Sequence, residues 1–281
     1  MTPPPARRHA GPPSRWAVGG ISRRRWTQRL IVVTVQTEDA ARRTTGITAE
    51  DAVEAVDWAG VAAGLDAVGI AATGPLVTAA ECRELGDLYD DDRRFRSTVD
   101  MARYRYGAGQ YRYFAHPLPD LVAGLRSALW PRLLPVARDW AARRHQPAPW
   151  PDALDEWLDR CHAAGQTRPT PLLLRYGPGD WNALHRDLYG DLVFPLQVVI
   201  GLDVPEVDYQ GGEFVVVEQR PRAQSRATTM PLPQGHGLVF TTRDRPVRGR
   251  RGWSSAPMRH GVSVVRSGRR RALGLVFHDA T

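Results

Sequence analysis

The chain has 281 residues and 42% hydrophobic content, which is enough for one large domain or for a domain with an extension. The longest apolar run, Leu30–Val35, is far too short to cross a membrane, and two cysteines exclude a disulfide-rich scaffold and are typical of a reducing cytoplasm. The net charge of +8 permits a nucleic-acid partner, but all 38 basic residues are arginine, a bias that genome composition also produces.

The positive charge is concentrated in two segments. Residues 1–43 carry nine Arg against Glu38 and Asp39, and residues 220–271 carry 13 Arg against Asp244 alone, a net charge of +12. The rest of the chain is acidic overall. The position of the second basic segment therefore says more about function than the summed charge does.

Three regions are predicted along the chain. Residues 1–45 are rich in Arg and Pro and are expected to be a disordered arm, or upstream sequence included by a wrong start codon. Their apolar run is too short for a signal peptide, so we expect a cytoplasmic protein. Residues 46–165 are expected to form a helical support region with one β-hairpin. Residues 166–281 are expected to form the catalytic half of the same integrated domain.

The support region contains clear helix signals. Thr48–Asp51 resembles a helix cap, and Thr78–Glu81 is a capping box. Further elements are predicted at 66–71 (strand), 103–114 (hairpin), 119–145 (a helix that Pro131 and Pro135 must kink or divide) and 154–161 (short helix). The aromatic residues of the hairpin either pack on the core, which we favour, or form a ribbon that stacks on a substrate.

Short β-rich segments dominate the second half. They are predicted at 172–176, 194–202, 213–218, 237–241, 261–265 and 272–278. Many short strands behind a helical first half predict an α+β fold, with a double-stranded β-helix (a jelly-roll or cupin-like barrel) buttressed by N-terminal helices.

A metal site is predicted in this half. Residues i and i+2 of a strand project to the same side, so His185 and Asp187 are expected to face one ion. His260, on a distant strand, completes two histidines and one carboxylate, a set that leaves metal positions open and is typical of non-haem Fe(II) oxygenases. For His162, His236 and His278, a surface or supporting role is favoured over metal binding.

The ordered motifs resemble the 2-oxoglutarate/Fe(II)-dependent oxygenase superfamily, in its prolyl-hydroxylase-like branch. The similarity covers residues 172–280 and lies in Tyr176–Asp187, Gly211–Phe214, Gly237–Phe240 and His260–Arg270. It is closest to bacterial oxygenases of unassigned substrate that are proposed to oxidise nucleic acid. The resemblance implies that His185, Asp187 and His260 hold Fe(II), with 2-oxoglutarate and O2 as co-substrates.

The resemblance also implies a co-substrate anchor. Arg270 would bind the distal carboxylate of 2-oxoglutarate, because a guanidinium forms two parallel hydrogen bonds with a carboxylate. Arg269 and Arg271 flank it, so the register stays open by one residue. Tyr176 is expected either to hydrogen-bond the co-substrate or to be a core residue of the barrel.

Substrate contacts are predicted at Trp181 and Asn182, beside the first ligand, and in the basic run 243–253. In that run Arg248, Arg250 and Arg251 would contact a polyanion and Trp253 would stack on a base, unless the run is only a solvated loop.

The sequence therefore predicts an Fe(II)- and 2-oxoglutarate-dependent dioxygenase that hydroxylates a C–H bond, releasing succinate and CO2. Its substrate is expected to be a damaged nucleic-acid base, single-stranded or flipped from a duplex. The alternatives are a protein or peptidyl (prolyl-type) hydroxylase and a non-catalytic cupin-type binding protein. No membrane partner is expected, and the sequence does not indicate an oligomeric state.

Overall fold

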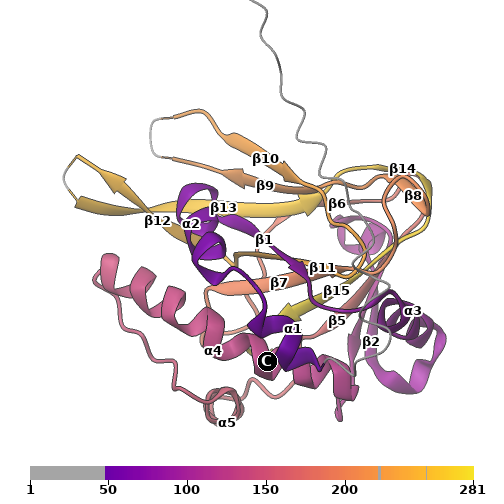
Figure 1. The fold of residues 1–281 in the computed structure, drawn as a ribbon, viewed down its shortest axis with the longest axis horizontal. Coiled ribbons are helices and arrows are strands. Elements are labelled where there is room, and N and C mark those ends of the chain that lie inside the picture. Colours follow the sequence, from indigo (N-terminus) through magenta and orange to yellow (C-terminus); the bar gives the residue numbers. More distant parts are fainter. Residues whose placement is uncertain (1–47, 221–222, 251) are drawn as a thin grey trace, which may run out of the picture. The chain divides into compact units, whose positions relative to one another are not determined.

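The computed structural model describes residues 48–220, 223–250 and 252–281, and the predicted arm at 1–45 lies outside them. Two antiparallel sheets form the centre of this part of the chain (Figure 1). The larger sheet has the strand order β1 (Ile70–Pro75), β11 (His236–Thr241), β7 (Leu196–Gly201), β15 (Arg270–Val276), β5 (Leu172–Tyr176), β4 (Gln110–Phe114), β2 (Phe95–Asp100).

The second sheet has the order β10 (Arg226–Met230), β9 (Phe214–Glu218), β13 (Gly252–Val262), β6 (Trp181–His185), β3 (Gly107–Ala108), with β12 (Asp244–Gly249) paired to β13. A separate pair joins β14 (Val265–Gly268) to β8 (Tyr209–Gly211). From β5 onward the chain alternates between the two large sheets, going from β5 to β6, back to β7, across to β9 and β10, back to β11, across to β13 and back to β15. This order is that of a jelly roll, so the predicted double-stranded β-helix is confirmed.

The helices are α1 (Ala49–Glu54), α2 (Trp58–Val68), α3 (Ala79–Asp87), α4 (Asp120–Arg143) and α5 (Leu154–Ala163). Short 3-10 turns lie at Leu88–Asp90, Asp92–Arg94 and Met101–Tyr104. The capping boxes at Thr48 and Thr78 are both formed. None of the helices within the described ranges is long and apolar enough to cross a membrane.

Two hydrophobic clusters lie on the two faces of the larger sheet. On one face α4 buries Leu129, Trp130 and Leu133 in the same cluster as Ile200 of β7. On the other face, between the sheets, Val199 of β7 joins a second cluster. All six residues of β7 are buried because this strand is covered on both sides. Cys82 and Cys161 are both buried.

Helix α4 is one uninterrupted helix of 24 residues, although it contains Pro131 and Pro135. Both prolines lie on its exposed side, where water can satisfy the carbonyl groups that they leave without a helical partner. Each interior proline costs about 3 kcal/mol, whereas burying each large apolar side chain of the opposite face contributes about 1.5–3 kcal/mol. Tertiary packing therefore keeps the helix whole.

Three predicted elements differ from the structure. The hairpin at 103–114 is wrong, because β3 pairs with β6 while β4 pairs with β2 and β5. The strand predicted at 66–71 begins only at Ile70, since α2 continues to Val68. The strand predicted at 261–265 is instead β13, which runs from Gly252 to Val262 and forms the second arm of a long hairpin with β12.

Candidate active site

The structure brings the three predicted metal ligands together at the junction of β6 and β13. His185 ends β6 and is the register partner of His260 in β13. The Nε2 atoms of His185 and His260 lie 3.4 and 3.2 Å from the two carboxylate oxygens of Asp187. Ligands on adjacent corners of an octahedron with bonds of about 2.1 Å are about 3 Å apart. The three side chains therefore form a set that fits one face of a metal ion.

Asp187 reaches this position by a different route from the predicted one. It lies after the end of β6, in a segment without regular structure, so the alternation of a strand does not orient its carboxylate. The hydroxyl of Tyr189 donates a 2.7 Å hydrogen bond to Asp187 Oδ1 instead. Tyr189 in turn accepts a 3.0 Å hydrogen bond from the hydroxyl of Tyr113. A tyrosine pair thus orients the carboxylate ligand.

The electrostatics favour the ligand forms of Asp187 and His260. Burial lowers the pKa of His185, but the neighbouring Asp187 carboxylate outweighs it and raises that pKa, so a metal ion would displace a proton from this ring. Burial opposes ionisation of Asp187, but the neighbouring imidazoles outweigh it and hold the pKa of the carboxyl well below its usual range. Burial lowers the pKa of His260, so its ring stays neutral. His185 Nδ1 lies 2.8 Å from the carbonyl oxygen of Ala183, and a proton placed there leaves Nε2 free to bind metal.

Replacing Tyr189 with phenylalanine is expected to weaken metal binding by about 10–100-fold, the usual cost of losing a partner that orients a ligand. Titrating metal-free protein with Fe(II) under anaerobic conditions measures this change. Tyr113→Phe is the matched control, because its hydroxyl is one hydrogen bond further from the carboxylate. An unchanged affinity in Tyr189→Phe contradicts the orienting role.

Arg270 is buried to 1% exposure and faces the same interior space. Its Nε and Nη2 atoms have no hydrogen-bond partner among the described residues, and its Cζ lies 5.4 Å from the ring centre of Tyr176. The flanking arginines are placed differently, since Arg271 forms an ion pair with Asp203 and Arg269 is exposed. Of these three arginines, Arg270 is therefore the one with buried N–H groups that lack a partner among the described residues.

A cavity of about 370 Å³ joins the metal ligands to Arg270. Tyr176 and Asn182 line it, and burial raises the pKa of Tyr176 to about 12, so its hydroxyl remains a donor. Asn182 and His185 are three residues apart, so in a regular strand their side chains would point to opposite faces. Both line the cavity because the pairing of β6 with β13 shifts register between His260 and Val262. Trp181 points elsewhere; it is exposed and does not line the cavity.

The mouth of the cavity carries exposed apolar side chains. Tyr106 and Leu188 line the cavity yet are 49% and 45% exposed. The ring of Tyr104 stacks on that of Tyr106, with centroids 5.6 Å apart and planes inclined by 19°. Exposed aromatic rings beside an open cavity are suited to stacking on a planar ligand.

The predicted basic contacts are not at the cavity. Arg248, Arg250 and Trp253 lie near the tip of the β12–β13 hairpin, and Arg251 lies outside the described residues. Eight residues of extended strand separate Gly252 from His260, which corresponds to about 26 Å. Trp253 already has Arg143 and Arg248 over its ring, at 4.7 and 5.4 Å from the centroid.

Two cavity residues escaped the sequence-based prediction. Tyr189 follows Asp187 by two residues. Gln197 lines the cavity from β7, and its buried Nε2 has no partner in the described part of the chain. A glutamine inside an otherwise apolar strand is the signal that would have identified it, because buried polar side chains usually have a structural or functional partner.

Of the other histidines, His278 is fully buried and accepts a hydrogen bond from the Phe194 amide, which is a supporting role.

A double-stranded β-helix that holds two histidines and a carboxylate inside its barrel defines the class of non-haem metal-dependent oxygenases. The sequence profile of one family in this class, described as an oxygenase catalysing oxidative methylation of damaged DNA, matches residues 109–280. The chain belongs to this oxygenase family. The expectation that this chain is an oxygenase is thereby confirmed.

The relatives include the uncharacterized protein Rv2227 of Mycobacterium tuberculosis, 67% identical over 167 residues, which are 59% of this chain and 72% of that protein. Among solved structures, a Pseudomonas putida prolyl-4-hydroxylase shares 15% identity over 80% of this chain and 99% of its own, with a TM-score of 0.44. A 2OG-Fe(II) oxygenase family oxidoreductase from Burkholderia pseudomallei shares 17% identity over 80% and 92%, with a TM-score of 0.46. These structural likenesses are remote, and it is the sheet order that identifies the fold.

Proposed function

We propose that this chain is an Fe(II)- and 2-oxoglutarate-dependent oxygenase that acts on a modified base of DNA. The observation that carries the proposal is the buried guanidinium of Arg270, whose Nε and Nη2 atoms have no partner among the described residues, on the wall of the cavity that holds the metal ligands. Buried N–H groups of a charged side chain are costly without a partner, so their presence favours a site built for an anionic ligand beside the metal.

The residues fit both groups. His185, Asp187 and His260 would hold iron, which when bound supplies the activation of dioxygen coupled to decarboxylation of 2-oxoglutarate to succinate and CO2. Arg270 would bind the distal carboxylate of 2-oxoglutarate through two parallel N–H donors. The Tyr176 hydroxyl, kept protonated, would donate a further hydrogen bond, while the apolar cavity walls limit the access of water.

Gly212, in the Gly211–Phe214 motif, has a physical role beside this pocket. Gly212 has a φ of 65°, and a Cβ added there would lie 2.7 Å from Arg270 Cδ. Gly212→Ala is therefore expected to strain the backbone and displace the guanidinium. Losing about 1.4 kcal/mol of binding free energy in this way would raise the KM for 2-oxoglutarate by about tenfold. Steady-state succinate release measures it. Gly249→Ala, at an exposed hairpin position with ordinary space, is the control; equal KM values for both variants contradict the prediction.

The mouth of the cavity supports a base as substrate. A base in a duplex must be unstacked to reach an enclosed oxidising centre, and aromatic side chains at the entrance offset that cost at about 1–3 kcal/mol for each stacked base. The stacked pair Tyr104 and Tyr106 provides such a surface. The description of the family names damaged DNA, which agrees with this assignment.

The β12–β13 hairpin would contact the same DNA at a distance. Its tip is about 26 Å from His260 along the strand, or about seven to eight base pairs of duplex.

Replacing the exposed Arg248 and Arg250 with alanine is expected to weaken DNA binding and to reduce the slope of log affinity against log salt by about 2. Fluorescence anisotropy at several salt concentrations measures the slope. Replacing the exposed Arg83 and Arg132 removes the same charge from helices α3 and α4 and is the control; an unchanged slope in the hairpin variant contradicts the contact.

The function is tested by following succinate and formaldehyde with Fe(II), 2-oxoglutarate and ascorbate present. The arms are no substrate, methylated single-stranded DNA, methylated duplex, unmethylated DNA and proline-containing peptides. Succinate release stimulated by methylated DNA, with matching formaldehyde, supports the proposal. Stimulation by the peptides alone replaces it with a protein hydroxylase, and absence of turnover in every arm contradicts the enzyme assignment.

A further inference from the structure

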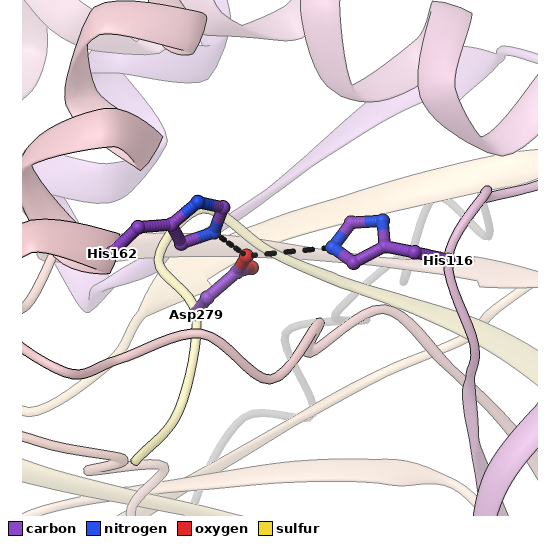
Figure 2. A group of neighbouring side chains, drawn as sticks. All are labelled: His116, His162 and Asp279. Carbon is purple, nitrogen blue, oxygen red and sulfur yellow. Dashed lines mark hydrogen bonds and ion pairs between the residues drawn. The ribbon is translucent and has the colours of Figure 1, made fainter.

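A second cluster of metal-binding side chains lies outside the cavity and is used by no step above. It consists of His116, His162 and Asp279, whose donor atoms all lie within 4.8 Å of one another. Figure 2 shows both imidazole rings pointing their Nε2 atoms at the same carboxylate. Asp279 Oδ2 lies 2.9 Å from His162 Nε2 and 3.9 Å from His116 Nε2.

The carboxylate is oriented by the protein and not only by the histidines. Asp279 is fully buried, and Arg126 donates a 3.0 Å hydrogen bond to its Oδ1 atom. Arg126 is itself fixed by a 2.9 Å hydrogen bond to the carbonyl of Val276. One carboxylate oxygen is therefore occupied, and the other is turned toward the two imidazoles. Metal-binding carboxylates are commonly held in this way by a second partner.

The spacing fits a tetrahedral transition metal. Ligands of a tetrahedral ion with bonds of about 2.05 Å lie about 3.3 Å apart, between the two observed separations of 2.9 and 3.9 Å. The side chains of His116 and His162 are 50% and 39% exposed, so each can rotate by the small amount required and an ion can enter from solvent. Two imidazoles and one carboxylate favour Zn(II) over Ca(II) or Mg(II), which prefer oxygen ligands.

The three ligands come from separate parts of the chain. His116 follows β4, His162 lies in α5 and Asp279 follows β15. An ion bound to all three would connect the segment after β15 (residues 277–281) to helix α5 and to the loop that precedes helix α4. That segment also contains His278, whose ring centre is 6.2 Å from that of Tyr189, the residue that orients the ligand Asp187.

We propose that His116, His162 and Asp279 form a second metal site, selective for Zn(II)-type ions, that fastens the C-terminal segment against α5 behind the catalytic pocket. The site stabilises the fold and takes no part in the oxidation. It is independent of the function proposed for the barrel, because it requires neither the triad nor 2-oxoglutarate.

The test is the number of Zn(II) equivalents bound by the metal-free full-length chain, measured against a chromophoric chelator. The wild type is expected to bind two equivalents with dissociation constants of about 10 µM or tighter. His116→Ala/His162→Ala and His185→Ala/His260→Ala are each expected to bind one, and the fourfold variant none. Zn(II) is expected to raise the Tm of the triad variant, His185→Ala/His260→Ala, because that variant keeps the second site. It is expected to leave the Tm of the fourfold variant, which combines all four substitutions, unchanged.

The variants are chosen so that folding does not decide the result. Removing the two exposed imidazoles leaves the Arg126–Asp279 ion pair intact, whereas Asp279→Asn would disturb it. His145→Asn, which removes another exposed histidine, is expected to keep two equivalents. The proposal is overturned if His116→Ala/His162→Ala binds as many equivalents as the wild type, or if the triad variant binds none.

Discussion

His185→Ala and His260→Ala are each expected to lower 2-oxoglutarate turnover by more than 100-fold. Losing a group that merely orients a ligand costs about 10–100-fold in metal affinity, and losing the ligand itself costs more. The Nε2 atoms of both rings face the same carboxylate, within 3.4 Å, so neither can be replaced by a neighbour in the described structure. Succinate release and Fe(II) binding, measured on the same samples, check the result.

The control for this prediction is His145→Asn, which changes an exposed histidine distant in sequence from both ligands. Circular dichroism establishes that each variant is folded before turnover is compared. If His185→Ala binds iron and consumes 2-oxoglutarate as the wild type does, the assignment of the triad is wrong. Loss of both in the variants, with His145→Asn unchanged, supports it.

Arg270→Leu is expected to change stability and co-substrate binding in opposite directions. The guanidinium is buried without partners for Nε and Nη2 in the described chain, so replacing it with an apolar side chain removes a desolvation cost and raises the free energy of unfolding of the ligand-free protein. The same change removes both donors to the distal carboxylate. At about 1.5–3 kcal/mol for each charge-assisted bond, 2-oxoglutarate affinity is expected to fall by about 100-fold or more.

Arg270→Lys separates charge from geometry. Lysine keeps the positive charge but cannot form two parallel bonds, so an intermediate loss of about 10–100-fold is expected. Chemical denaturation and calorimetric titration of 2-oxoglutarate give the two quantities. Arg269→Leu, at an exposed neighbouring position, is expected to alter neither. A wild-type affinity in Arg270→Leu assigns the anchoring role to another residue.

Much of the architecture followed from local patterns. The capping boxes at Thr48 and Thr78 satisfy backbone donors within three residues, so they form wherever the sequence occurs. The strand at Leu172–Tyr176 was predicted at its observed bounds because an apolar β-rich run stands between turn residues. The hairpin predicted at 103–114 failed because strand pairing depends on distant segments. The residues of β4 pair with residues 10–19 positions away in β2 and 59–65 positions away in β5.

The candidate site likewise has features that the sequence predicts and features that depend on the fold. The sequence by itself determined which residue types were available, namely two histidines and a carboxylate in a recurring order, with an arginine ten residues beyond the second histidine. It could not say which of Arg269, Arg270 and Arg271 faces the cavity, because that depends on the pairing of β15 with β5 and on the ion pair between Arg271 and Asp203.

The tertiary structure alone decided what surrounds those residues. It added Tyr189 and Gln197 to the cavity, placed the basic hairpin about 26 Å from the metal ligands, and joined His116, His162 and Asp279 from three separate segments. The physical reason is range. Caps, turns and alternation act over a few residues and can be read along the chain, whereas burial, ion pairing and the convergence of ligands depend on which distant segments the fold brings into contact.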